Sequence, residues 1–107
     1  MALTESQFEM QADATLTKMV DALADLEDDA LEADLESGVL SLRFEDGAKF
    51  VVNSHRAALQ IWMAAGATAW HFDFDGKQWI AAKSGDELWD TVEKCTSEKL
   101  GRPIRLR

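Results

Sequence analysis

The side chains with the clearest chemical potential in this 107-residue sequence are carboxylates gathered in one short stretch. They lie between positions 21 and 36 and comprise Asp21, Asp25, Glu27, Asp28, Asp29, Glu32, Asp34 and Glu36. Carboxylate oxygens without cysteine or histidine suit hard cations such as calcium, magnesium, manganese and iron. Because the spacing is not that of an EF-hand loop, we expect metal binding here to be weak, spread over several sites and poorly selective.

The net charge is distributed unevenly along the sequence, as the carboxylates are. The formal net charge is −9, made up of −11 over residues 1–46 and +2 over residues 47–107. Such an acidic half repels nucleic acid and anionic membranes, and it attracts cations or a basic protein surface. The acidic run is therefore compatible with a metal site, with a docking surface for a basic partner, or with a solvated face that has neither role.

A long amphipathic helix must position the first of these acids. Thr4 and Gln7 have the spacing of a capping box, and the helix is expected from about Thr4 to Leu26. Its apolar stripe comprises Phe8, Ala12, Leu16, Met19, Val20, Leu23 and Leu26. The sequence pattern places Asp21, Asp25 and Asp28 on one face near the negative end of the helix dipole, where anions are unfavourable. We therefore expect salt, divalent cations, or replacement of Asp25, Asp28 and Asp29 by Asn to raise the melting temperature.

After Leu31 the apolar period changes to two residues, which is typical of strands with one solvated face. The pattern predicts strands at residues 31–36, 40–44, 50–52, 60–63, 69–74 and 78–82, with irregular chain at 53–56. Ser84 and Glu87 then resemble the capping box of a second helix that ends at Gly101. The inner face of that helix is expected to contain Leu88, Trp89, Val92 and Cys95. We therefore predict one α+β domain over residues 1–107: a two-layer α-β sandwich, with an antiparallel sheet of five to six strands on the N- and C-terminal helices.

Other reactive residue types give weaker signals. Cys95 falls on an apolar helix stripe, which favours an inert thiol. Trp70, Phe72, Trp79 and Trp89 are interpreted as core residues. His55 and His71 are interpreted as surface histidines, with His71 on the outer face of the sheet. If Ile61 points inward, Trp62 lies exposed beside Asn53, Gln60 and His71 as an anchor for a partner; the alternative is that Trp62 itself points inward.

The sequence lacks the signatures of most enzyme classes. It has no phosphate-binding glycine loop, no paired cysteines with zinc spacing and no His-x-x-x-His pair. We expect no enzymatic activity, apart from a weak ferroxidase-type oxidation of iron as the least favoured hypothesis. With one cysteine, no signal-peptide pattern and no stretch of about 20 apolar residues, we expect a cytoplasmic protein that is monomeric without metal and contacts neither nucleic acid nor membrane.

Short motifs in a fixed order along nearly the whole chain resemble the frataxin family, specifically its bacterial CyaY branch. They begin with the acidic first helix and strand and continue with Ser37-Gly38-Val39-Leu40, Asn53, Gln60-Ile61-Trp62, His71-Phe72-Asp73, Trp79-Ile80, Ser84-Gly85 and Leu88-Trp89-Asp90. Between Asn53 and Gln60, where frataxins commonly carry Gln and Pro, this sequence reads Ser-His-Arg-Ala-Ala-Leu.

The resemblance implies a function in iron–sulfur cluster assembly. It implies that the acidic run binds ferrous and ferric iron and docks onto the basic surface of the cysteine desulfurase. It also implies that Asn53, Gln60, Trp62 and His71 contact the iron–sulfur scaffold protein. Two hypotheses follow: an iron donor, or iron chaperone, that also regulates the desulfurase–scaffold complex, and a pure interaction module whose metal binding is incidental.

Overall fold

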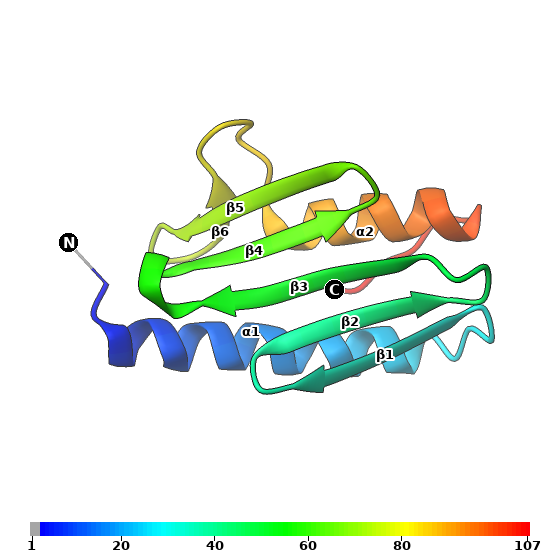
Figure 1. Ribbon diagram of the computed structural model, residues 1–107, viewed down its shortest axis with the longest axis horizontal. Helices are drawn as coiled ribbons and strands as arrows, with labels where there is room; N and C mark the ends of the chain where they lie inside the picture. Colours follow the sequence, from blue (N-terminus) through cyan, green and yellow to red (C-terminus); the bar gives the residue numbers. More distant parts are fainter. Residues whose placement is uncertain (1–2) are drawn as a thin grey trace.

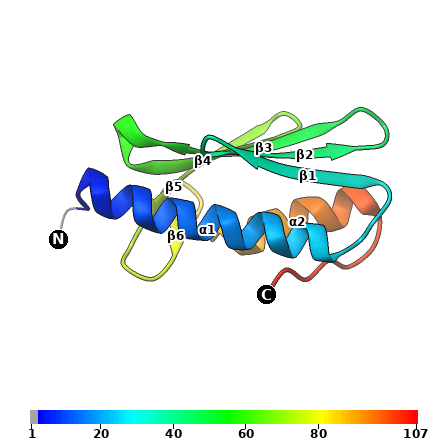
Figure 2. The same ribbon diagram turned by 90° about the horizontal axis from the view of Figure 1, so that it is seen from below.

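Two helices cover the same face of a six-stranded antiparallel sheet in the computed structural model, which describes residues 3–107 (Figures 1 and 2). This arrangement confirms the predicted two-layer α+β fold. The elements are α1 (Glu5–Asp25), β1 (Leu31–Glu36), β2 (Val39–Phe44), β3 (Lys49–His55), η1 (Arg56–Ala58), β4 (Gln60–Ala65), β5 (Thr68–Phe74), β6 (Trp79–Ala81) and α2 (Leu88–Leu100).

Each strand pairs with the next one in the chain, so the sheet order is β1-β2-β3-β4-β5-β6 throughout. Short turns between strands allow only this antiparallel meander. The turn between β1 and β2 contains Ser37 and Gly38, both with positive φ, and the register that it sets pairs Glu36 with Val39. The edge strands are the acidic β1 and the three-residue β6.

The hydrophobic core lies between the sheet and the helices. It is formed by the apolar side chains that alternate along the strands and by those of the apolar helix faces. Most inward positions of β2 to β5 are buried, although Trp70 and Phe74 of β5 are only partly buried, and α1 contributes about one buried side chain per turn. After α2, the apolar residues of the C-terminal tail also pack into this layer. The buried side chains of the strands and the tail include Leu40, Leu42, Val52, Ile61, Met63, Phe72, Ile104 and Leu106.

The structure confirms the start of α1 and corrects the interpretation of its end. Thr4 and Gln7 form the predicted capping box. The helix ends at Asp25, and Glu27 adopts a left-handed backbone conformation with φ 49°. Asp28 therefore does not continue the helical face of Asp21 and Asp25, because the chain has already turned toward β1.

The segment around residue 55 is also more regular than predicted. Asn53, Ser54 and His55 belong to β3 and pair with β4, whereas we expected irregular chain from 53 to 56. The following residues form the short 3₁₀ turn η1, closed by a hydrogen bond from the Ala58 N–H to His55 Nδ1 at 3.3 Å. Pairing with β4 therefore extends β3 to His55, whose side chain lies on the surface of the sheet.

The second helix begins later than its sequence pattern suggested. Its N-cap is Glu87, whose carboxylate accepts hydrogen bonds from the N–H groups of Trp89 and Asp90 at 2.9 and 3.0 Å. The prediction that Ser84 caps the helix is wrong. Ser84 lies in a preceding turn, in which its own N–H and that of Gly85 donate hydrogen bonds to the Ala81 carbonyl.

The buried face of α2 is correspondingly shifted. It comprises Leu88, Thr91, Val92 and Thr96, whereas Trp89 and Cys95 are only partly buried. Of the other aromatic residues interpreted as core, Phe72 and Trp79 are buried and Trp70 is partly exposed. Within residues 3–107, neither helix has the length and apolar character needed to cross a membrane.

Candidate functional site

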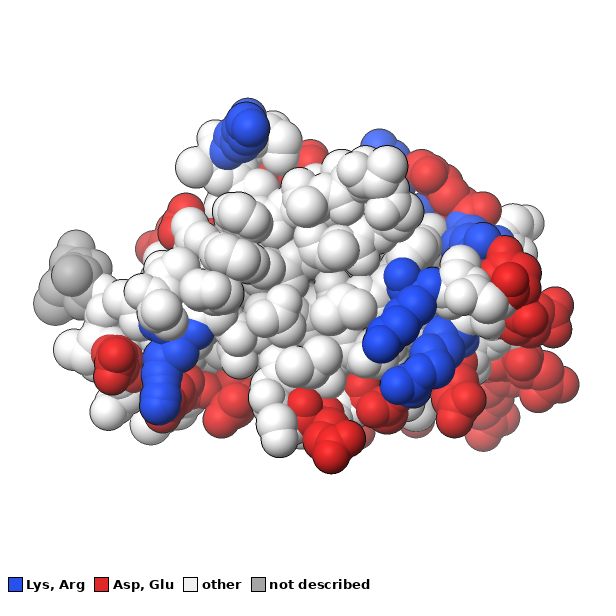
Figure 3. All heavy atoms as spheres, in the orientation of Figure 1, with Lys and Arg blue, Asp and Glu red and all other residues white. Residues whose placement is uncertain are grey.

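The predicted carboxylates form a continuous band along one edge of the molecule, which we call the acidic ridge (Figure 3). Its members come from three segments: the last turns of α1, the loop that follows, and the outer face of edge strand β1. They are Asp21 and Asp25, then Glu27, Asp28 and Asp29, then Glu32, Asp34 and Glu36. No basic residue occupies the last turn of α1, so the helix itself does not neutralise the acids at its C-terminal end.

Two members of the ridge are held in ion pairs. Asp28 accepts hydrogen bonds from the Arg102 side chain and from the Ala30 N–H. The hydrogen bond from Arg102 has the larger effect, and together the two bonds hold the pKa of Asp28 below its usual value. Asp34 pairs with Arg43 on the neighbouring strand β2. These two carboxylates are therefore less available to a cation than their sequence positions suggested.

The other ridge carboxylates have no basic partner within residues 3–107. They do not converge on a point either: over the same residues, no three Asp, Glu, His or Cys side chains form a group that could hold a metal ion. The ridge thus offers one or two carboxylates at any place, with the remaining ligands left to water. Chemically this is an open, strongly negative surface without a preformed chelate.

The second candidate surface lies on the outer face of the sheet, away from the helices. Asn53, Trp62 and His71 are direct cross-strand neighbours on β3, β4 and β5, and Ile61 and Met63 point inward. The interpretation of Trp62 as an outward residue is therefore confirmed. Gln60 shares this face, and its side-chain oxygen accepts a hydrogen bond from Trp62 Nε1 at 2.8 Å. The four predicted contact residues form one cluster.

A fifth residue, His55, belongs to this cluster and was missed as a member of it. Its ring stacks on Trp62 with centroids 3.8 Å apart and planes 16° from parallel. His71 stacks on Trp62 as well, at 4.2 Å and 13°. The sequence pattern did not reveal this, because His55 opposes Gln60 only once β3 is extended by three residues beyond the predicted strand.

The surroundings of the two surfaces differ in charge. Figure 3 shows that the outer face of the sheet is mostly uncharged and is bordered by Lys and Arg side chains and by acidic ones. The basic side chains of β2 and β3 on this face are Arg43 and Lys49, which are cross-strand neighbours. A partner that covers both surfaces would therefore meet an uncharged patch beside a strongly negative edge.

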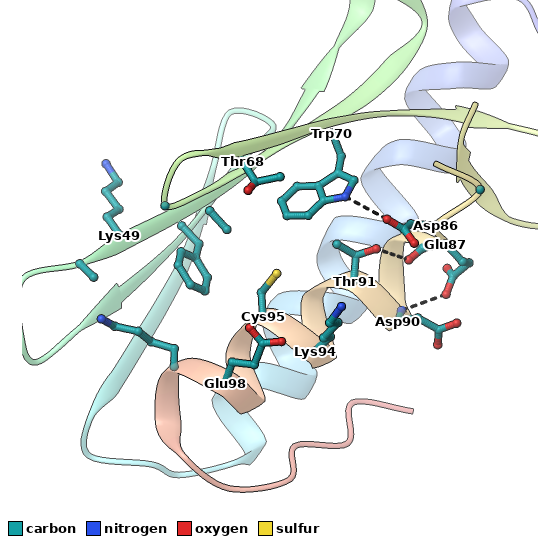
Figure 4. A pocket seen from close by; sticks show the side chains of 16 residues that line it. Lys49, Thr68, Trp70, Asp86, Glu87, Asp90, Thr91, Lys94, Cys95 and Glu98 are labelled. Atoms are coloured by element: carbon teal, nitrogen blue, oxygen red, sulfur yellow. Dashed lines mark hydrogen bonds between the residues drawn. The ribbon is translucent and has the colours of Figure 1, made fainter. Parts of the chain in front are cut away.

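A groove of about 880 Å³ lies between α2 and the ends of β3 to β5 (Figure 4). Trp70 forms one wall, and its Nε1 donates a hydrogen bond to Asp86 at 3.1 Å. Cys95 faces this groove. Burial raises the pKa of its thiol, and the negative charge of Glu98 raises it further. The thiol is therefore protonated at neutral pH, which agrees with the predicted inert cysteine.

Comparison with known families identifies the chain. A family model described as "Frataxin-like domain" matches residues 1–102. The chain belongs to the frataxin-like family. This family is linked to iron–sulfur cluster assembly.

Solved frataxins share the fold of this frataxin-like chain. The frataxin from Psychromonas ingrahamii, of the CyaY protein family, is 22% identical with a TM-score of 0.89, over 97% of this chain and 98% of that one. Trimeric frataxin from the yeast Saccharomyces cerevisiae, complexed with ferrous iron, is 23% identical with a TM-score of 0.76, over 95% and 90%. The same yeast protein with its full-length N-terminus has a TM-score of 0.75 at 23% identity, over 95% and 84%.

Proposed function

We propose that this chain binds iron weakly and reversibly at the acidic ridge, and that it serves iron–sulfur cluster assembly in the cytoplasm as an iron donor and regulator. The observation that carries the proposal is the band of carboxylates along α1, the following loop and β1, most of which have no basic partner within residues 3–107. Iron in either oxidation state accepts such oxygen ligands. The yeast frataxin solved with ferrous iron supports a metal-binding role for a protein of the same fold.

The partners in this proposal are the cysteine desulfurase and the iron–sulfur scaffold protein. The ridge would dock on a basic surface of the desulfurase, since opposite charges steer such encounters. The uncharged cluster of Asn53, Gln60, Trp62 and His71 would contact the scaffold protein. Because the two surfaces are neighbours, one complex could engage both together.

The test of the metal site is an anaerobic titration of the metal-free protein with ferrous iron, followed by amide NMR shifts. We expect shifts confined to residues 20–36. They should shrink in the double variant Asp25→Asn, Asp29→Asn. The matched control is Asp13→Asn, Glu98→Gln, which removes the same charge from exposed positions outside the ridge. Equal losses in both variants would mean that only the net charge attracts the ion.

The second candidate is a pure interaction module, in which the ridge exists only for its basic partner. It is favoured by the ion pairs of Asp28 and Asp34, which leave the ridge without a preformed chelate. Linkage separates the two functions: if iron changes the affinity for the desulfurase, the desulfurase must change the affinity for iron by the same factor. No amide shifts at near-millimolar iron would favour the interaction module.

A further inference from the structure

The aromatic stack on the sheet surface has a feature that the proposed partner contact does not explain. Two imidazole rings at 3.8 and 4.2 Å from the indole centroid, both nearly parallel to it, cannot share one face of the indole. They approach from strands on opposite sides of β4, with His55 on β3 and His71 on β5. Both faces of Trp62 are therefore covered by its own neighbours.

Hydrogen bonds also hold the Trp62 indole in its position between the two imidazole rings. Trp62 Nε1 donates to Gln60 Oε1 at 2.8 Å, and Gln60 Nε2 donates in turn to Asp73 Oδ1 at 3.0 Å. His55 is tethered as well, because its Nδ1 accepts the Ala58 N–H. In the neutral ring this leaves the proton on Nε2. The indole is thus held by two ring contacts and by a relay that spans β4 and β5.

Side chains of a sheet stand roughly perpendicular to it, so the three stacked rings turn their edges, rather than their faces, toward a partner. Ring edges carry the positive end of the aromatic quadrupole. They favour contact with carbonyl oxygens and with apolar groups over face-to-face stacking.

Resting on the proposed scaffold contact, we infer that His55 is a positioning residue that holds Trp62 upright, so that a partner loop with exposed backbone carbonyls meets the edges of the ring stack. His71 completes the stack from the other side. The role assigned to His55 acts through Trp62 and does not require His55 itself to touch the partner.

Two substitutions at one position separate the ring contact from the cap of η1. His55→Phe keeps an aromatic ring and loses the acceptor for the Ala58 N–H. His55→Asn keeps an acceptor suited to that cap and loses the ring. Two readouts apply to each variant: ¹⁵N relaxation of the Trp62 indole N–H, and the affinity for a purified bacterial iron–sulfur scaffold protein by calorimetry.

We expect His55→Asn to mobilise the indole and to weaken scaffold binding roughly two- to tenfold, the range that one aromatic pair contributes. His55→Phe should keep both properties near those of the unmodified protein. An indole as rigid in His55→Asn as in the unmodified protein would overturn the inference, and so would a mobile indole with unchanged affinity. If the unmodified protein does not bind the scaffold protein, the proposed contact fails, whereas the relaxation data still decide whether His55 positions Trp62.

Discussion

The guanidinium group of Arg102 donates two hydrogen bonds to the same carboxylate oxygen of Asp28, from Nη2 at 2.7 Å and from Nε at 3.1 Å. The two residues are 74 positions apart, and their pairing joins the segment after α2 to the loop after α1. The Asp28 side chain is only 17% exposed. A cation from the far end of the chain thus neutralises one acid at the negative end of the first helix.

This pair predicts a particular response to acid. The pKa of Asp28 is lowered in the folded protein, so its contribution to stability is present above the ordinary aspartate pKa of about 4 and is lost as the pH falls through the folded value. Arg102→Gln should remove the principal cause of that shift. The free energy of unfolding should then fall less steeply between about pH 5 and pH 2 than in the unmodified protein.

Urea unfolding at a series of pH values measures this slope. Arg105→Gln is the matched control, because Arg105 is exposed and carries the same charge. Equal slopes in the two variants would show that the effect comes from net charge rather than from the pairing with Asp28.

A second prediction concerns the unpaired acids of the ridge. Asp25 lies in the last turn of α1, where an anion costs about 0.3–1 kcal/mol, and Asp29 adds repulsion from the adjacent loop. Replacing both with Asn should raise the melting temperature by a few degrees at low salt. The gain should shrink in 0.5 M NaCl, because salt screens the same repulsion.

Asp28→Asn should have the opposite sign, with a small fall in melting temperature as the bond to Arg102 weakens. The sequence alone predicted a rise when Asp25, Asp28 and Asp29 are replaced together, with no exception for Asp28. Scanning calorimetry of the single variants distinguishes the two expectations, and a rise for Asp28→Asn would mean that repulsion within the ridge outweighs its ion pair.

Local sequence patterns determine only part of this structure. The layers, the strand order and the outward face of Trp62 follow from periodicity and short turns, which are properties of neighbouring residues. The partners of Asp28 and Trp62 depend on contacts between distant segments. Arg102 is 74 residues from Asp28, and His55 joins the ring stack only because pairing with β4 extends β3. Such contacts have no local signature in a single sequence.

A third prediction tests the corrected start of α2. Glu87 is only 7% exposed, and its carboxylate caps the helix and also pairs with Arg107 at 2.5 Å. Glu87→Ala should lower the free energy of unfolding by about 0.5–2 kcal/mol, the usual cost of a lost N-cap. Ser84→Ala should change it much less, since Ser84 is exposed in the preceding turn. A larger loss for Ser84→Ala in urea unfolding would restore the sequence-based assignment of the cap.

The fourth prediction compares two buried threonines on α2. Thr91 Oγ1 donates a hydrogen bond to the Glu87 carbonyl at 2.7 Å, whereas Thr96 Oγ1 is buried with no hydrogen-bond partner among the described residues. An unsatisfied buried hydroxyl costs about 1–3 kcal/mol, and a satisfied one contributes about 0.5–1.5 kcal/mol. Valine has nearly the shape of threonine without the hydroxyl. Thr96→Val should therefore raise the free energy of unfolding by about 1 kcal/mol, and Thr91→Val should lower it by a similar amount.

Urea unfolding of both valine variants at neutral pH measures their free energies of unfolding, which should differ by about 2 kcal/mol. The two sites share one helix and one substitution, so helix propensity cancels between them. If Thr96→Val loses as much stability as Thr91→Val, the Thr96 hydroxyl makes a stabilising bond in solution. In that case the packing of α2 against the sheet differs from the arrangement described above.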